Sequence, residues 1–139
     1  MVPQSVVCQH RGTFGGVGMR YWATVGETVL KSKAGVPEAA VVTTAYVREP
    51  RDRSRPVTFR FNGGAGLGLG RASGGGVRRD DGAPPYPLLD NPDSLLDVTD
   101  LVLIDPSGTG FSVLLPGADA KDYHGVQQDA RAVAEVICR

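Results

Sequence analysis

The sequence predicts an α/β fold in which antiparallel edge strands open a sheet that parallel strands and a helix then continue. Residues 40–47 are dense in β-branched side chains, as strands are. Residues 101–104 (LVLI) form an unbroken apolar run, which is typical of a strand covered on both faces. Residues 126–137 repeat apolar side chains with helical spacing. Because these elements cannot cover both faces of a parallel sheet, the predicted domain is incomplete.

The first half of the chain predicts antiparallel strands after an irregular start. Residues 1–19 are interpreted as an irregular lead-in, and the α/β domain is expected over residues 20–139. Residues 20–31 alternate polar and apolar side chains around an apparent bend at residues 25–28 (VGET), which predicts either a hairpin or one bulged strand. The strand at residues 40–47 follows the next turn.

The second half alternates glycine-rich loops with short elements. A strand at residues 56–61 runs into residues 62–70, where five glycines exclude a regular helix or strand. Residues 71–100 lack periodicity and are predicted to be a long loop. The strand at residues 101–104 precedes a helix whose expected buried stripe consists of Val126, Ala130, Val133, Ala134 and Ile137.

Composition excludes several classes of function. The 139 residues carry 15 Lys and Arg against 15 Asp and Glu, and this zero net charge argues against a nucleic-acid partner. No apolar run is long enough to span a membrane, and the N-terminus lacks a signal-peptide pattern, so the compartment stays open. Cys8 and Cys138 lie at opposite ends without ligand spacing, which favours two free thiols over one terminal bridge and predicts no metal or cofactor.

The glycine-rich segment after residues 56–61 is the first candidate site. Its glycines fit neither the dinucleotide-binding fingerprint nor a phosphate loop. At the carboxyl end of a strand, such a segment can present backbone N–H groups to a ligand or to the oxyanion of an acyl transfer. The alternative from the residues alone is a tight turn without a ligand.

Several ordered blocks resemble the bacterial branch of the serine carboxypeptidase family. Residues 55–66 (RPVTFRFNGGAG) are similar to its strand and oxyanion-hole motif, although Ala65 replaces a proline and Leu67-Gly68 replaces small hydroxyl or thiol residues. The further blocks are DGAPP at residues 81–85, NPDSLLD at 91–97, DPSGTGFS at 105–112 and HGVQQDA at 124–130. The resemblance spans about residues 20–139.

The resemblance implies an α/β-hydrolase fold and removal of C-terminal residues from peptides by a Ser-Asp-His triad. Gly64 would supply one oxyanion-hole N–H, while Asn62 and Gly63 would bind the terminal carboxylate of the substrate, Asn62 through its side-chain amide. For Asn62 the alternative is a cap of the glycine turn. Residues 105–112 would shape the floor of the site.

The sequence contains no recognisable nucleophile. A nucleophile elbow requires Gly-x-Ser-x-Gly, and none of the serines stands in that frame. His10 and His124 are interpreted as surface residues, and the aspartates between residues 80 and 100 as turn residues rather than paired catalytic acids. The chain is therefore expected to stop before the nucleophile strand and to be inactive alone.

Two alternatives to an enzyme remain open. One is a non-catalytic module that binds peptide C-termini or a partner through the glycine loop and an exposed sheet edge. The strand at residues 57–61 would normally be flanked by the nucleophile strand, so its unpaired edge predicts possible self-association. The other alternative is a truncated fragment without a function of its own.

Overall fold

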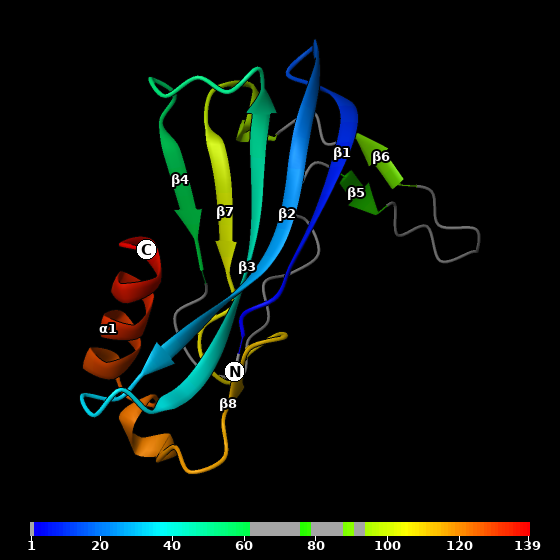
Figure 1. Ribbon diagram of the computed structural model, residues 1–139. Helices are drawn as coiled ribbons and strands as arrows, with labels where there is room; N and C mark the ends of the chain where they lie inside the picture. Colours follow the sequence, from blue (N-terminus) through cyan, green and yellow to red (C-terminus); the bar gives the residue numbers. More distant parts are fainter. Residues whose placement is uncertain (1, 62–75, 79–87, 91–93) are drawn as a thin grey trace.

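A mixed sheet of six strands forms the main body of the computed structural model, which describes residues 2–61, 76–78, 88–90 and 94–139. The spatial order is β1-β2-β3-β7-β4, and β8 pairs with the beginning of β3. Figure 1 shows the long twisted sheet with helix α1 beside it. This confirms the α/β class in a coarse form, a mixed sheet with a C-terminal helix. The bounds are β1 Ser5–Phe14, β2 Val17–Lys31, β3 Pro37–Glu49, β4 Val57–Arg60, β5 Gly76–Arg78, β6 Leu88–Asp90, β7 Asp100–Ile104, β8 Val113–Leu114 and α1 Val126–Ile137.

Strands β1 and β2 form an antiparallel hairpin, so the prediction of an irregular lead-in over residues 1–19 is wrong. Their register runs from Ser5 opposite Gly26 to Phe14 opposite Val17. The turn consists of Gly15 and Gly16, both with positive φ, which L side chains rarely adopt. Strand β1 is an edge strand that is exposed along most of its length. Its sequence is therefore polar and alternates only weakly, which is why the sequence did not predict a strand there.

Strand β2 is continuous through the bend that the sequence suggested at residues 25–28. Gly26 lies inside it, opposite both Ser5 of β1 and Thr43 of β3. The register shifts only at Leu30/Lys31, near the end of the strand. Of the two sequence interpretations, the single strand is correct, and pairing on both sides overrides the local turn preference of Gly26.

Strand β7 occupies the interior of the sheet, as its apolar run predicted. It pairs antiparallel with β3 and parallel with β4. Leu101 faces one core cluster and Val102 the other, because successive strand residues face opposite sides. Leu101 packs with Phe14, Tyr21 and Leu96, and Leu96 comes from the short 3-10 helix η1 (Leu95–Asp97).

Helix α1 covers the other face, but with a different stripe from the predicted one. Ala132 and Val133 are buried and pack with Leu30 and Ile104. Of the predicted stripe only Val133 is buried, and Val126 is 90% exposed. The observed face is rotated by roughly a quarter of a turn. Sequence periodicity could not separate the two faces because small alanines lie on both.

A buried ion pair joins the beginnings of β4 and β7. The guanidinium of Arg55 donates to Asp100 Oδ1 at 3.2 Å and to the carbonyls of Leu96 and Asp97 at 2.9 and 3.3 Å. The backbone N–H of Arg48 donates to the same carboxylate oxygen. The guanidinium of Arg48 also donates to the Asp97 carbonyl, at 3.5 Å, so two arginines hold η1 in place.

Candidate functional site

The carboxyl ends of β4 and β7 lie side by side and define the candidate site. The two strands are parallel, with Arg60 opposite Leu103, so the chain leaves both strands at the same edge. Residues 105–112 follow β7 there. Asn62, Gly63 and Gly64 follow β4 in the sequence, but they lie outside the described residues. The described part of the predicted site is therefore the turn at residues 105–112.

The carboxylate of Asp105 organises this turn. Its Oδ2 accepts a hydrogen bond from the backbone N–H of Phe111 at 3.0 Å. Gly110, at φ +53°, leaves no room for a side chain, because a Cβ there would collide with the Asp105 carboxylate. Asp105 thus acts as a structural acceptor that closes the loop, and glycine is required at residue 110.

Ser112 ties the turn to the sheet. Its hydroxyl donates to the Asp105 carbonyl at 2.6 Å and accepts from the backbone N–H of Val42 at 2.7 Å. The Asp105 N–H in turn donates to the Val42 carbonyl. Inside the turn, the backbone N–H and the hydroxyl of Thr109 both donate to the Pro106 carbonyl. These hydrogen bonds together fix the conformation of the turn and its position against β3.

Ser107 differs from its neighbours because its buried hydroxyl has no hydrogen-bond partner among the described residues. The residue is 2% exposed, and its hydroxyl makes no hydrogen bond within the part of the chain that the structure describes. The imidazole Nε2 of His124 lies 3.2 Å from the position that a Cβ on Gly108 would take. The fold therefore brings His124 beside the turn. No hydrogen bond joins Ser107 and His124 in the described part of the chain, and His124 is exposed.

His10 and the two cysteines lie away from this turn. His10 stacks on Tyr21 in the β1–β2 hairpin at a ring distance of 5.6 Å. Cys8 in β1 and Cys138 after α1 are exposed free thiols. Among the described residues, no cluster of His, Cys, Asp and Glu side chains is arranged for a metal ion, and no helix is long and apolar enough to cross a membrane.

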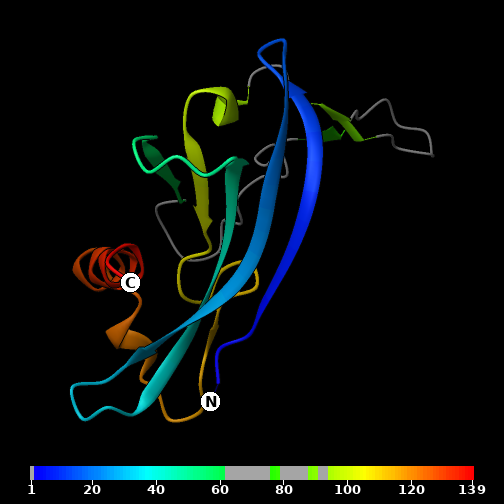
Figure 2. The same ribbon diagram turned by 45° about the horizontal axis from the view of Figure 1, so that its top comes forward.

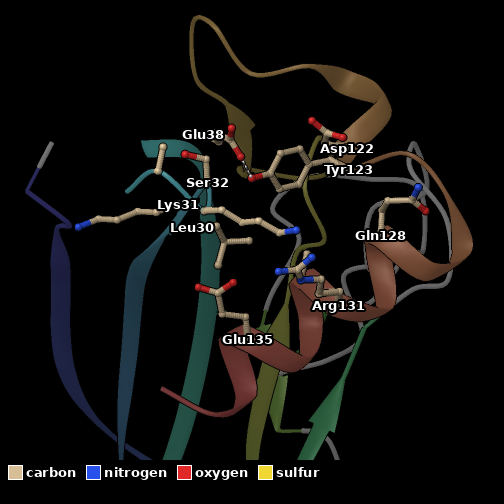
Figure 3. A pocket seen from close by; sticks show the side chains of 12 residues that line it. Leu30, Lys31, Ser32, Glu38, Asp122, Tyr123, Gln128, Arg131 and Glu135 are labelled. Carbon is tan, nitrogen blue, oxygen red and sulfur yellow. Dashed lines mark hydrogen bonds between the residues drawn. The ribbon is translucent and has the colours of Figure 1, made fainter. Parts of the chain in front are cut away.

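A hollow of 530 Å³ between the β2–β3 turn and α1 was missed by the sequence analysis. Figure 3 shows the side chains of Lys31 and Arg131 extending towards each other across it. Tyr123 donates to Glu38 Oε2 at 2.9 Å (Figure 3), and burial together with this bond raises the pKa of Tyr123 to about 12. Its phenol is therefore a hydrogen-bond donor at neutral pH and not a base.

A second hollow, of 760 Å³, is cationic and lies on the β1–β3 strands. Arg11 and Arg20 are opposite each other in the strand register, and Arg20 pairs with Glu49 at 3.4 Å. Arg48 completes the lining charges. These residues are far apart in the sequence and become neighbours through the pairing of β1, β2 and β3. The sequence analysis did not predict β1 as a strand, so it could not predict this hollow.

Comparisons with known proteins found no match for the chain. No family model matches it, and neither does any curated protein or solved structure. The functional assignment therefore depends on the residues and geometry described above.

Proposed function

We propose that the chain forms the oxyanion-hole and carboxylate-binding part of a hydrolase similar to the serine carboxypeptidases, built on the N-terminal part of an α/β-hydrolase sheet. The supporting observation is the parallel pairing of β4 with β7. The chain leaves the sheet after β4 and returns between β3 and β4. Both motif segments, residues 62–64 and 105–112, therefore begin at the carboxyl edge where α/β sheets bind ligands.

The proposed roles divide between two segments. Gly64 donates its backbone N–H to the oxyanion that forms when a peptide carbonyl is attacked. Asn62 and Gly63 bind the terminal carboxylate of the peptide, Asn62 through its side-chain amide. The turn at residues 105–112 would shape the floor of the site, and hydrogen bonds of Asp105 and Ser112 fix its conformation. Groups that are already in place need not reorganise during the reaction.

The reaction would be acyl transfer. A serine hydroxyl attacks the carbonyl, Gly64 stabilises the oxyanion, and water then hydrolyses the acyl-enzyme. Since no serine of these residues stands in a Gly-x-Ser-x-Gly frame, the attacking hydroxyl is not expected from this chain. The purified chain should release no C-terminal amino acid from blocked dipeptides. Release that a serine-directed inhibitor abolishes would contradict the expected inactivity of this chain.

Carboxylate recognition gives a direct test of the binding half. Calorimetric titration with an N-blocked dipeptide should show binding of the free acid and weaker or no binding of its C-terminal amide. Asn62→Ala should weaken binding of the acid, and Asn62→Asp should weaken it further by charge repulsion. Asn91→Ala serves as the matched control, because that asparagine has no proposed role. Equal binding of acid and amide would exclude the proposed recognition.

The alternative function is a non-catalytic module that binds peptides or a partner through the same loop and the edge of β4. The half-exposed apolar side chains of β4 favour it. A peptide analogue with an internal phosphonate separates the two, since its tetrahedral anion resembles the transition state. An oxyanion site should bind the phosphonate more tightly than the parent peptide, and Gly64→Pro, which removes the N–H, should cancel the difference. A simple binding module should show no such preference.

A further inference from the structure

Strand β4 forms one edge of the sheet. It pairs with β7 on one side, and no other strand within the described ranges pairs with its second side. Val57, Phe59 and the adjoining Phe61 are 48%, 37% and 46% exposed. An edge with unpaired backbone groups and exposed apolar side chains is a template for pairing with another chain. Natural edges are usually protected by charges, by proline or by being short. Strand β4 is short and follows Pro56, but Arg60 is the single charge between residues 57 and 61.

The chemistry of this edge is symmetric about Phe59. In β4 the apolar Val57 and Phe59 alternate with the polar Thr58 and Arg60, and Phe61, which follows the strand, continues the alternation in the sequence. Reversing the strand exchanges Val57 with Phe61 and Thr58 with Arg60, and the apolar–polar pattern is unchanged. Two identical strands can therefore pair around a two-fold axis with their faces matched, as an isologous interface requires.

We propose that a second copy of this chain pairs antiparallel with β4 around a two-fold axis at Phe59, so that the sheet continues from one molecule into the other. In this register Phe59 opposes Phe59 of the second copy, and Val57 opposes its Phe61. Aromatic and β-branched pairs of this kind stabilise neighbouring strands. Thr58 opposes Arg60 of the second copy, so no like charges stand directly opposite each other.

Charge favours this antiparallel arrangement over a parallel one. The Arg-rich segment at residues 51–55 immediately precedes β4. In the antiparallel pair the two segments lie at opposite ends of the shared sheet, whereas a parallel pair would place them together. The two Arg60 side chains are diagonal neighbours, about 7–8 Å apart at Cα. Their repulsion is screened by salt, so the dimer should become more stable as ionic strength rises.

The surroundings of β4 fit a modest interface. Helix α1 lies on the β4 side of the molecule in both Figure 1 and Figure 2, and its Val126 and Ile137 are exposed. A short strand pair alone buries less than the roughly 1,200 Å² of a standard interface, so the association should depend on concentration. The opposite edge, β1, also exposes apolar side chains, Val6 and Val7, although Gln9, His10 and Arg11 make its middle polar, so the test needs a variant on each edge.

The oligomeric state in solution tests the proposal. Sedimentation equilibrium over a wide concentration range should show the average mass rising from 14.6 kDa towards twice that value, and further at higher salt. Phe59→Lys should keep the mass at the monomer value, while Val7→Lys on the β1 edge should leave dimerisation unchanged. Circular dichroism confirms that both variants are folded. A monomer at every concentration, or a dimer that only Val7→Lys abolishes, would overturn the proposal.

A cysteine pair tests the register independently of the lysine variants. In a chain with Cys8→Ser and Cys138→Ser, Phe59→Cys should form a disulfide-linked dimer on mild oxidation, because its two copies oppose each other. Thr58→Cys opposes Arg60 and should cross-link much more slowly. A faster reaction at residue 58 than at residue 59 would contradict the two-fold axis. The carboxylate titration concerns residues 62–64 and not the β4 edge. Carboxylate binding can therefore be observed without dimerisation, and dimerisation without carboxylate binding.

Discussion

Two buried serines in one turn show how differently the same side chain can contribute. The hydroxyl of Ser112 is doubly bonded, to the Asp105 carbonyl and the Val42 N–H. The hydroxyl of Ser107 is equally buried but has no partner among the described residues. Burying a hydroxyl is unfavourable unless hydrogen bonds replace those to water. Ser112 therefore stabilises the turn, whereas Ser107 contributes packing and a desolvation penalty.

Replacing these serines by alanine should give opposite results. Ser112→Ala leaves the Val42 N–H without this acceptor and the Asp105 carbonyl without this donor. The free energy of unfolding should therefore fall by about 1–3 kcal/mol. Ser107→Ala removes an unsatisfied hydroxyl and should leave the free energy of unfolding unchanged or raise it. Urea unfolding of the two variants measures both. An equal loss in the two variants would mean that the Ser112 bonds do not hold the turn.

The raised pKa of Tyr123 predicts that the protein loses stability at alkaline pH. Burial, reinforced by the hydrogen bond to Glu38, raises its pKa from 10.0 to about 12. A raised pKa means that the folded state keeps a proton that the unfolded state has lost. The stabilisation is therefore complete below pH 10 and is lost as pH rises from 10 to 12.

Tyr123→Phe should remove this pH dependence. The variant should be less stable than the parent at neutral pH, because Glu38 loses its donor, and the difference should shrink between pH 10 and pH 12. The difference between the two proteins isolates Tyr123 from Tyr46, whose pKa burial also raises. Parallel stability curves across that range would contradict the assigned pKa.

At the scale of elements, the Arg55–Asp100 pair joins β4 to β7 and to η1. The two side chains are largely buried, and the guanidinium also donates to two carbonyls of η1. Removing one member of a buried pair leaves the other charge uncompensated. This pair therefore helps to align the two parallel strands whose carboxyl ends form the candidate site.

Arg55→Ala should consequently destabilise the protein by about 3–5 kcal/mol. Arg139→Ala provides the matched control, because its pair with Glu135 is exposed on α1, where such pairs contribute about 0.3–0.5 kcal/mol. Thermal or urea unfolding monitored by circular dichroism compares them. Similar small losses in both variants would show that the buried pair does not align the strands.

Sequence patterns predicted elements that have a strong local signal. The β-branched segment became β3 and the LVLI run became β7, an interior strand. The patterns failed where pairing decides the structure: β1 is a polar edge strand, and β2 continues through Gly26 because strands flank it on both sides. The buried face of α1 depends on its docking, which alternating small apolar residues do not specify.

The site was predictable only as chain segments. The turn at residues 105–112 follows a central strand, as the motif indicated, but the roles of Asp105 and Ser112 within it required the structure. Both hollows combine residues from segments that are distant in the sequence, so no sequence motif could have predicted them. Asn62, Gly63 and Gly64 lie outside the described residues, and their roles stay a prediction from the sequence.

At the scale of the whole molecule, one mixed sheet with a core cluster on each face predicts a single cooperative unfolding transition. Coincident transitions by far-ultraviolet circular dichroism and by Trp22 fluorescence would support it, since Trp22 lies in the middle of the β1–β2–β3 pairing. A gradual, non-coincident transition would instead favour a fragment that lacks a stable fold of its own.

The most direct test of the central claim is a residue-resolved titration of the isotopically labelled chain by nuclear magnetic resonance. An N-blocked peptide acid should shift the backbone amide signals of Gly63 and Gly64 and the side-chain amide of Asn62 in a saturable manner. The matched peptide amide should leave these three signals in place. Identical shifts with both peptides, or shifts confined to other parts of the chain, would contradict a carboxylate and oxyanion site at the end of β4.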